Sequence, residues 1–281
     1  MKGITTKLQQ PSDYSQIVEI YKPVGKTPYE MVRQYREDNS IPNSVKIGYA
    51  GRLDPMADGV LVLMIGKATK EQKKLLKKNK VYEFTALLGF ATDSYDLLGI
   101  VQEFTGNSQN AKNLSHAELI SKDVVSMFTE SMLAQVGKFT QKYPPFSAYL
   151  IKGKPMHALA RTGELAQIPE NKFPSRRREI FSIKLIDEST ISLNLLREYI
   201  YKYIPYINGY FRQDDVLAKW DDVFKQIRHD INASGTLQFP LLRFRAHVSS
   251  GTFIRSLVHE TGQKVGVPAL AISITRTKVG M

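Results

Sequence analysis

The chain of 281 residues contains no cysteine. This absence excludes disulfide bonds, thiolate nucleophiles and cysteine-ligated zinc, and it is typical of proteins in reducing compartments. The chain also lacks an apolar run long enough to span a bilayer, and its first twenty residues contain no apolar segment of signal-peptide length. We therefore expect a globular, cytoplasmic protein that does not enter the membrane.

Acidic residues are in the minority, because 27 Asp and Glu stand against 39 Lys and Arg, a formal net charge of +12. Such an excess attracts polyanions and makes nucleic acid the first partner to consider. A solubility charge and an affinity for anionic lipid are the alternatives. Hydrophobic residues make up 42% of the chain, enough for a substantial core.

The most distinctive stretch runs from Gly48 to Gly59 and precedes an apolar run over 60–65. Its glycines permit a positive φ or a close approach of another molecule, and Pro55 biases Asp54 towards an extended conformation. Two interpretations follow. Asp54 either hydrogen-bonds its own backbone in an ordinary turn, or it is a single acid held in a fixed pose for chemistry.

The N-terminal region shows a clear change from irregular to ordered sequence. Residues 1–16 have no periodicity and are expected to form a flexible leader, and an alternating strand follows at 17–21. Thr27 and Glu30 have the spacing of a capping box, which predicts a helix beginning there.

A second capping box, Thr69 with Gln72, predicts a helix over 71–79. This region is rich in lysine, and its lysines form either an ordinary solvated face or a ridge that contacts phosphates. The candidate phosphate contacts include Lys70, Lys73 and Lys74.

Two alternating segments, 80–89 and 242–248, are typical of strands, and a helix is expected to begin near Thr252. Arg255 falls in the first turn of that helix. Because a helix N-terminus favours anions, an arginine there is either exposed or has a dedicated carboxylate or phosphate partner.

Residues 187–238 are rich in aromatic residues and contain the single tryptophan, Trp220, within a helix expected over 214–230. Aromatic and basic residues in alternation can stack on bases. Packing within a local subdomain is the alternative, because aromatic stripes commonly belong to a core.

Taken together, the motifs of this chain resemble, in content and order, those of TruB-type tRNA pseudouridine synthases. The resemblance extends over residues 17–280. The motifs are Lys22–Thr27, Gly51–Pro55 with Gly59–Leu61, Gly66–Lys70, Lys80–Tyr82, Thr92–Asp96, Pro144–Pro145, Ala160–Gly163, Ser250–Leu257 and Thr275–Thr277.

The resemblance implies an α/β (α+β) fold with a mixed, mostly antiparallel central sheet, flanking helices and a catalytic cleft. It implies one catalytic domain over 17–281, with an inserted element at about 187–238. The implied reaction isomerises uridine to pseudouridine at position 55 in the T loop of tRNA. It requires no metal or redox cofactor, and we expect a monomer whose partner is the T arm.

The resemblance also assigns roles to individual residues. Asp54 is the expected catalytic carboxylate, which either attacks the ribose carbon or removes a ribose proton. Arg255 is expected to pair with Asp54, and Tyr82 to stack on the target base once it is flipped out of the RNA. Phe253 and Ile274 would line the apolar side of the pocket.

Lys22, Lys70, Lys73 and Lys74 complete the expected RNA contacts. Three positions depart from the family pattern, which usually has His where Tyr49 stands, Thr where Arg52 stands and Tyr where Phe253 stands. Tyr49 and Arg52 are expected to contact the substrate in their own way. The departures motivate an alternative, a non-catalytic tRNA-binding or folding chaperone with the same fold. A basic structural protein would require the ordered motifs to be coincidence.

Overall fold

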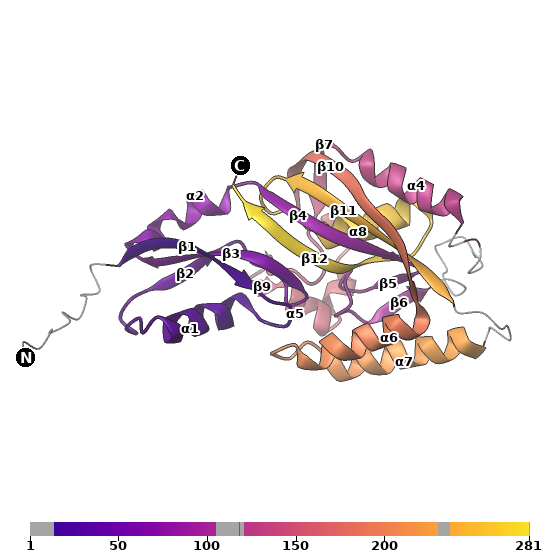
Figure 1. Ribbon diagram of the computed structural model, residues 1–281, viewed down its shortest axis with the longest axis horizontal. Helices are drawn as coiled ribbons and strands as arrows, with labels where there is room; N and C mark the ends of the chain where they lie inside the picture. Colours follow the sequence, from indigo (N-terminus) through magenta and orange to yellow (C-terminus); the bar gives the residue numbers. More distant parts are fainter. Residues whose placement is uncertain (1–13, 105–117, 119–120, 230–236, 281) are drawn as a thin grey trace, which may run out of the picture.

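The computed structural model describes residues 14–104, 118, 121–229 and 237–280, and a large sheet organises them (Figure 1). Eight strands form this sheet. They are β1 (Ser15–Lys22), β2 (Ile47–Ala50), β3 (Ala57–Gly66), β4 (Lys80–Leu88), β7 (Gly137–Lys142), β10 (Ser175–Ser192), β11 (Gln238–Val248) and β12 (Ala269–Val279).

The strand order is β1-β3-β12-β4-β11-β10-β7, with β2 paired to β3 off this path. Within this sheet, β12 runs parallel to β3, and the other pairs are antiparallel. The expectation of a mixed, mostly antiparallel sheet with flanking helices is therefore confirmed.

The helices that surround the sheet differ in length and place (Figure 1). They are α1 (Pro28–Asp38), α2 (Gln72–Leu76), α4 (Lys122–Leu133), α5 (Met156–Arg161), α6 (Leu193–Tyr203), α7 (Gln213–His229) and α8 (Ile254–Val265). Two small hairpins add β5 (Phe90–Thr92) with β6 (Val101–Phe104), and β8 (Leu150–Ile151) with β9 (Lys154–Pro155).

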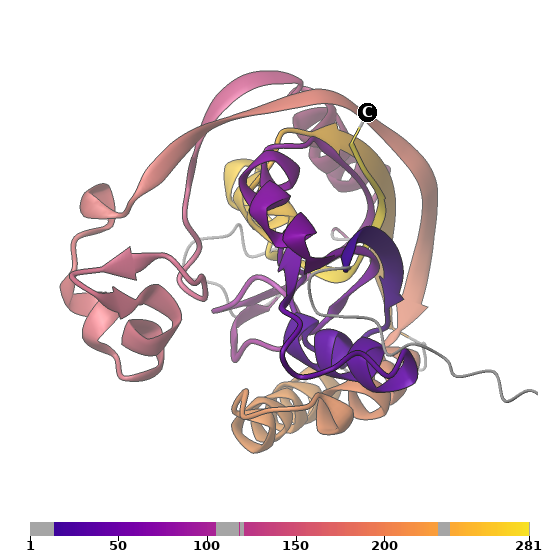
Figure 2. The ribbon, with the colours of Figure 1, turned by 90° about the vertical axis from the view of Figure 1, so that its left-hand side faces the viewer.

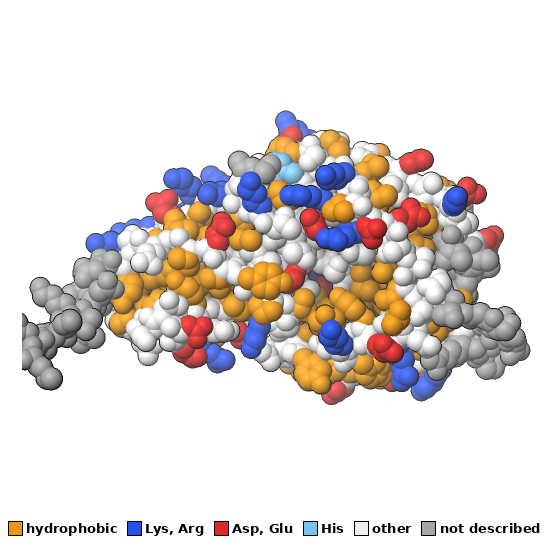
Figure 3. All heavy atoms as spheres, viewed as in Figure 1, with side chains coloured by type: hydrophobic (Ala, Val, Ile, Leu, Met, Phe, Trp, Pro, Cys, Tyr) orange, Lys and Arg blue, Asp and Glu red, His pale blue; other side chains and the backbone are white. Residues whose placement is uncertain are grey.

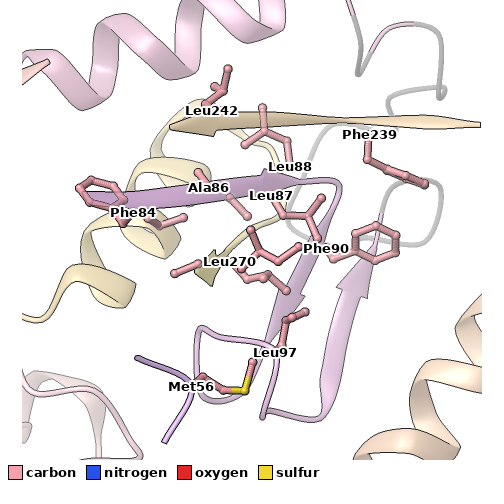
Figure 4. Packing of buried hydrophobic residues seen from close by; sticks show 14 of the residues in the cluster. Met56, Phe84, Ala86, Leu87, Leu88, Phe90, Leu97, Phe239, Leu242 and Leu270 are labelled. Carbon is pink, nitrogen blue, oxygen red and sulfur yellow. The ribbon is translucent and has the colours of Figure 1, made fainter. Parts of the chain in front are cut away.

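The main core lies between the sheet and helices α4, α6, α7 and α8, and Figure 4 shows part of its packing. Phe84 of β4 stacks on Phe244 of β11 with ring centroids 5.6 Å apart. Phe90 fills the space between Phe239, at 4.7 Å, and Trp220, at 5.2 Å. These rings are each fully or almost fully buried, so the hydrophobic effect attaches α7 to the large sheet through Phe90 of β5.

The N-terminal elements pack as a second cluster, in which Met31 of α1 lies with buried residues of β3. The predicted capping box at the start of α1 is confirmed, because Thr27 Oγ1 accepts from the Glu30 amide at 3.2 Å and Glu30 Oε2 accepts from the Thr27 amide at 2.7 Å. The first strand begins at Ser15, two residues inside the expected leader, and the leader residues 1–13 lie outside the described part of the chain.

The helix predicted over 71–79 is present but shorter, and the capping box predicted for it is wrong. A 3₁₀ turn, η2 (Lys67–Glu71), leads into α2, which has five residues and no side-chain cap. Thr69 Oγ1 donates to the Gly66 carbonyl at 2.8 Å instead of capping a helix. Threonine hydroxyls can bond nearby backbone in this way, so the capping-box spacing does not by itself impose a long helix.

The 187–238 segment begins with the end of β10 and continues through α6, a short 3₁₀ turn η5 (Ile204–Tyr206) and α7. The expected helix over 214–230 is α7, shifted by one residue at each end. Leu196, Ile200 and Trp220 are fully buried against the main core, so packing accounts for much of the apolar content of this segment. Tyr206 and Tyr210, at the turn between the helices, are exposed.

Strands β7 and β10 extend to a small lobe that contains β8, β9 and α5 (Figure 2). Met156 and Leu159 of α5 are buried in the lobe's own cluster. Residues 137–148 consist of β7 and the loop that follows it.

Candidate active site

The loop that carries Asp54 connects β2 to β3 and is anchored by a buried arginine of β12. Arg276 Nε donates to the Val60 carbonyl at 2.7 Å, and its Nη2 donates to the Gly51 carbonyl at 3.0 Å. Gly59 has a φ of +107° and lies so close to β12 that an added Cβ would be 2.2 Å from the Arg276 carbonyl oxygen. This glycine is therefore required by both backbone conformation and space.

Asp54 faces Arg255, and Arg255 Nε donates to Asp54 Oδ2 at 3.0 Å. The remaining two guanidinium nitrogens donate to the carbonyls of Ser94, at 2.6 Å, and Phe146, at 2.8 Å. The Arg255 side chain is 3% exposed and the Asp54 side chain is 36% exposed. The arginine is thus fixed by three segments, and the carboxylate that it holds remains accessible to another molecule.

A second carboxylate lies behind Arg255. Asp96 is buried and accepts from the Ser94 hydroxyl at 2.6 Å and from the Leu98 amide at 3.1 Å. Burial raises the pKa of Asp96 to about 6, although the positive charge of Arg255 opposes this shift. For Arg255 itself, burial lowers the pKa, but Asp54 and Asp96 outweigh burial and raise it above its usual value.

Lys22 lies at the end of β1, fully buried, and its Nζ donates to the carbonyls of Pro23, at 3.0 Å, and Lys26, at 2.7 Å. Burial lowers the pKa of Lys22 to about 8, while Asp58 and Asp54 partly offset that shift. The amine therefore contributes charge within the protein near the Asp54 loop and does not reach the surface.

Tyr82 and Ile274 lie on the strands beside this loop. Tyr82 of β4 stands opposite Arg276, the residue that anchors the Asp54 loop. Ile274 of β12 is half-buried and stands opposite Ala57, the first residue of β3. Both side chains are therefore near the base of the Asp54 loop.

Phe253 precedes α8 and is held by a pair of hydrogen bonds. Its amide donates to Gln141 Oε1 at 2.9 Å, and its carbonyl accepts from Gln141 Nε2 at 3.0 Å. Its ring lies 5.8 Å from the guanidinium carbon of Arg255 and 5.5 Å from the Tyr143 ring, edge-on. Phe253 is thus an apolar neighbour of the charged pair.

The other expected contact residues lie on β2, on the loop that follows it, and on η2 and α2. Tyr49 packs against the N-terminal cluster, and its carbonyl accepts from Gln72 at 3.1 Å, while Arg52 is exposed. Exposed lysines lie along η2, along α2 and just after α2, beside β2. Figure 3 shows basic side chains gathered over α2. These lysines, which we call the lysine ridge, are Lys67, Lys70, Lys73, Lys74, Lys77 and Lys78.

Sequence reasoning assigned no role to several residues of this site. Asp96 belongs to a segment that is typical of a turn, and its burial has no local signal. Ser94 and Phe146 contribute backbone carbonyls, which any residue carries. Arg276 does have a signal, because it lies within the Thr275–Thr277 motif that the resemblance includes.

Among the residues that the structure describes, no group of three or more His, Asp and Glu side chains is placed to hold a metal ion. Within the same residues, the helices are too short or too polar to cross a membrane.

Comparisons with known proteins agree with one another. Residues 39–196 match the model of the TruB family pseudouridylate synthase (N terminal domain). The chain is 31% identical over 264 residues to tRNA pseudouridine synthase B of Lacticaseibacillus paracasei, covering 94% of this chain and 67% of that protein. It is 30% identical over 316 residues to tRNA pseudouridine synthase 4 of Saccharomyces cerevisiae, covering 98% and 73%. The chain thus spans about two thirds to three quarters of these relatives.

Among solved structures, the chain resembles one in the crystal structure of a Cbf5-Nop10-Gar1 complex, with a TM-score of 0.52 and 19% identity. The match covers 96% of this chain and 50% of that chain. At this identity the likeness concerns the fold.

Proposed function

The chain belongs to the TruB family of pseudouridylate synthases, and we propose that it isomerises uridine to pseudouridine in tRNA, at position 55 of the T loop. The relatives reported above are named tRNA pseudouridine synthases, which supports tRNA as the substrate. The observation that carries the proposal is the accessible carboxylate of Asp54, held at 3.0 Å by the buried Arg255.

In the proposed reaction, Asp54 acts as an ionised carboxylate at the ribose. It either attacks C1′, displacing uracil, or removes a ribose proton, and the two routes are both compatible with its position. The glycosidic bond from C1′ to N1 breaks and the uracil turns. A new bond then joins C1′ to C5 as the bond from Asp54 to C1′ breaks or the ribose proton returns. C5 loses its proton and N1 gains one, so the product is an isomer.

The apolar neighbours of the pair suit a flipped-out base. Extraction of a uridine from a folded loop loses stacking, which contact with aromatic and apolar side chains offsets in part. Tyr82, Phe253 and Ile274 are the proposed contacts, on the grounds of their positions next to the Asp54 loop and Arg255. We assign the lysine ridge to phosphates of the same RNA, because its exposed ammonium groups lie beside the strand that leads to the loop.

The proposal is tested with an unmodified tRNA transcript, purified wild-type protein and two variants. Asp54→Asn keeps the size of the side chain and removes its charge. Asp58→Asn, which alters a carboxylate four residues away, is the matched control. We expect site-resolved pseudouridine detection to show modification at the T-loop position with wild type and Asp58→Asn, and none with Asp54→Asn.

Other results would change the proposal in defined ways. Modification at another uridine would retain the reaction and reject the T-loop assignment. Binding of the transcript without modification by wild type would favour the chaperone. Equal modification by Asp54→Asn would reject the catalytic role of Asp54.

A further inference from the structure

We propose that Arg212, in the 187–238 segment, is a positioning residue that fixes the geometry of the Asp54–Arg255 pair. The rate measurements that test this proposal rest on the proposed function. This assigns to the helical segment a role in the active site in addition to its packing on the core.

Arg212 makes two contacts with segments next to the pair. Its Nη1 and Nη2 donate to Asp93 Oδ2, at 2.9 Å, and Oδ1, at 3.1 Å, in a two-point ion pair whose side chains are 17% and 16% exposed. Its guanidinium carbon lies 4.5 Å from the centroid of the Phe146 ring. The planar guanidinium thus engages a carboxylate and an aromatic ring simultaneously, which a lysine does less well.

The same two segments hold Arg255. Asp93 is followed by Ser94, whose carbonyl accepts from Arg255 Nη1, and the Phe146 carbonyl accepts from Arg255 Nη2. Arg212 and Arg255 therefore secure one pair of segments from two different parts of the chain. Displacement of either segment would move an acceptor of Arg255 and, through it, the carboxylate of Asp54.

A second connection joins this segment to the Asp54 loop. The backbone amide of Asn208 donates to the Gly25 carbonyl at 3.2 Å, and the backbone amide of Gly25 donates to the Pro55 carbonyl at 2.9 Å. The turn between α6 and α7 thus reaches the active-site loop as well as the Arg255 acceptors.

The backbone at Arg212 supports a specific placement. Arg212 has a φ of +61°, a left-handed conformation that residues other than glycine seldom adopt. Such a conformation persists where surrounding contacts determine it. The packing of Trp220 and Ile200 already attaches the helices to the core, so their attachment alone does not require an arginine in this conformation.

The test compares Arg212→Ala with Arg197→Ala. Arg197 is a matched control in the same segment, because it also has an ion pair, with Asp221 at 3.7 Å, and an aromatic neighbour, Tyr201 at 5.4 Å. We expect Arg212→Ala to lower the single-turnover rate about tenfold with unchanged tRNA affinity, since small displacements of reacting groups are costly. Arg197→Ala should retain the wild-type rate.

Two further variants separate positioning from folding. Arg212→Lys should recover part of the rate that Arg212→Ala loses. Asp93→Asn should lower the rate in the wild type, but add little in the Arg212→Ala background, because both changes break the same ion pair. A crystal structure of Arg212→Ala should show Arg255 displaced from Asp54.

An unchanged rate for Arg212→Ala would overturn the inference, and so would weaker tRNA binding at an unchanged rate, which would indicate a phosphate contact. A lower rate accompanied by a lower melting temperature in Arg212→Ala, with neither recovered in Arg212→Lys, would indicate a structural role only. If wild type does not modify tRNA, the proposed function fails. The crystal structure of Arg212→Ala then tests the positioning role by itself. An Arg255 side chain in its wild-type position would reject that role.

Discussion

Arg255 Nε lies 3.0 Å from Asp54 Oδ2, although 201 positions separate the two residues in the chain. The contact depends on three acceptors around one planar guanidinium, because the Ser94 and Phe146 carbonyls orient the group that holds the carboxylate. The orientation of the Asp54 carboxylate therefore depends on segments far from its own loop.

Replacement of this arginine by lysine should be severe. Arg255→Lys retains a positive charge but cannot serve the three acceptors in the same geometry. We expect the single-turnover rate of pseudouridine formation to fall by about 10²-fold. Arg245→Lys, at a half-exposed arginine of β11, should leave the rate unchanged. Near-wild-type activity in Arg255→Lys would show that orientation by the guanidinium is not required.

Gly59→Ala should destabilise the fold. The added Cβ would lie 2.2 Å from the Arg276 carbonyl oxygen, at a φ of +107°. We expect a loss of roughly 2 to 5 kcal/mol in the free energy of unfolding, from backbone strain and overpacking. Gly163→Ala, at a φ of +76° with no atom within 4 Å of the added Cβ, should lose about 1 kcal/mol. Urea unfolding measures both, and equal losses would contradict the steric argument.

Asp96 should make stability depend on pH. Its pKa is about 6 in the folded protein, against 3.8 as the ordinary value, so the folded state binds the proton more tightly. The resulting stabilisation is present below pH 3.8, the ordinary value, and is lost as the pH rises through about 6. We expect the difference in unfolding free energy between wild type and Asp96→Asn to fall over this range and to level off above it. A difference that is independent of pH would show that folding does not raise the pKa of Asp96.

The lysine ridge should contribute to RNA affinity in a salt-dependent way. Triple replacement of Lys70, Lys73 and Lys74 by alanine should reduce the slope of log affinity against log salt by roughly 1 for each phosphate that the protein ceases to neutralise. The control replaces Lys184, Lys219 and Lys225, which lie on β10 and α7. Filter binding with unmodified tRNA measures both slopes. Equal reductions would show that the ridge has no special place in the interface.

Local signals in the sequence predict local structure well in this protein. The Thr27 capping box, the strand containing Tyr82 and the helix containing Trp220 each depend on residues close to one another in the chain. The Thr69 pattern fails because the preceding turn at Gly66 offers the hydroxyl a nearby carbonyl. The same spacing therefore has different outcomes in different backbone surroundings.

The active site is less accessible to such reasoning. An arginine in the first turn of α8 is compatible with exposure or with an anionic partner. The pairing with Asp54 is expected from the family resemblance alone, and the fold brings the two side chains together. Asp96 and Asp93 stand three residues apart in one polar turn, yet one is buried and the other pairs with an arginine 119 positions away. Burial and long-range pairing depend on the whole fold, and a local sequence pattern predicts neither.

The place of β12 in the sheet has a consequence for synthesis. This strand follows the other strands in the chain, yet it lies between β3 and β4 and is paired with both. Until it emerges from the ribosome, one edge of β4 and residues 57–59 of β3 lack their partner, and open edges invite pairing with other chains. Arg276, the anchor of the Asp54 loop, arrives with the same strand. A nascent chain thus acquires the shared partner of these two strands and the anchor of the Asp54 loop together.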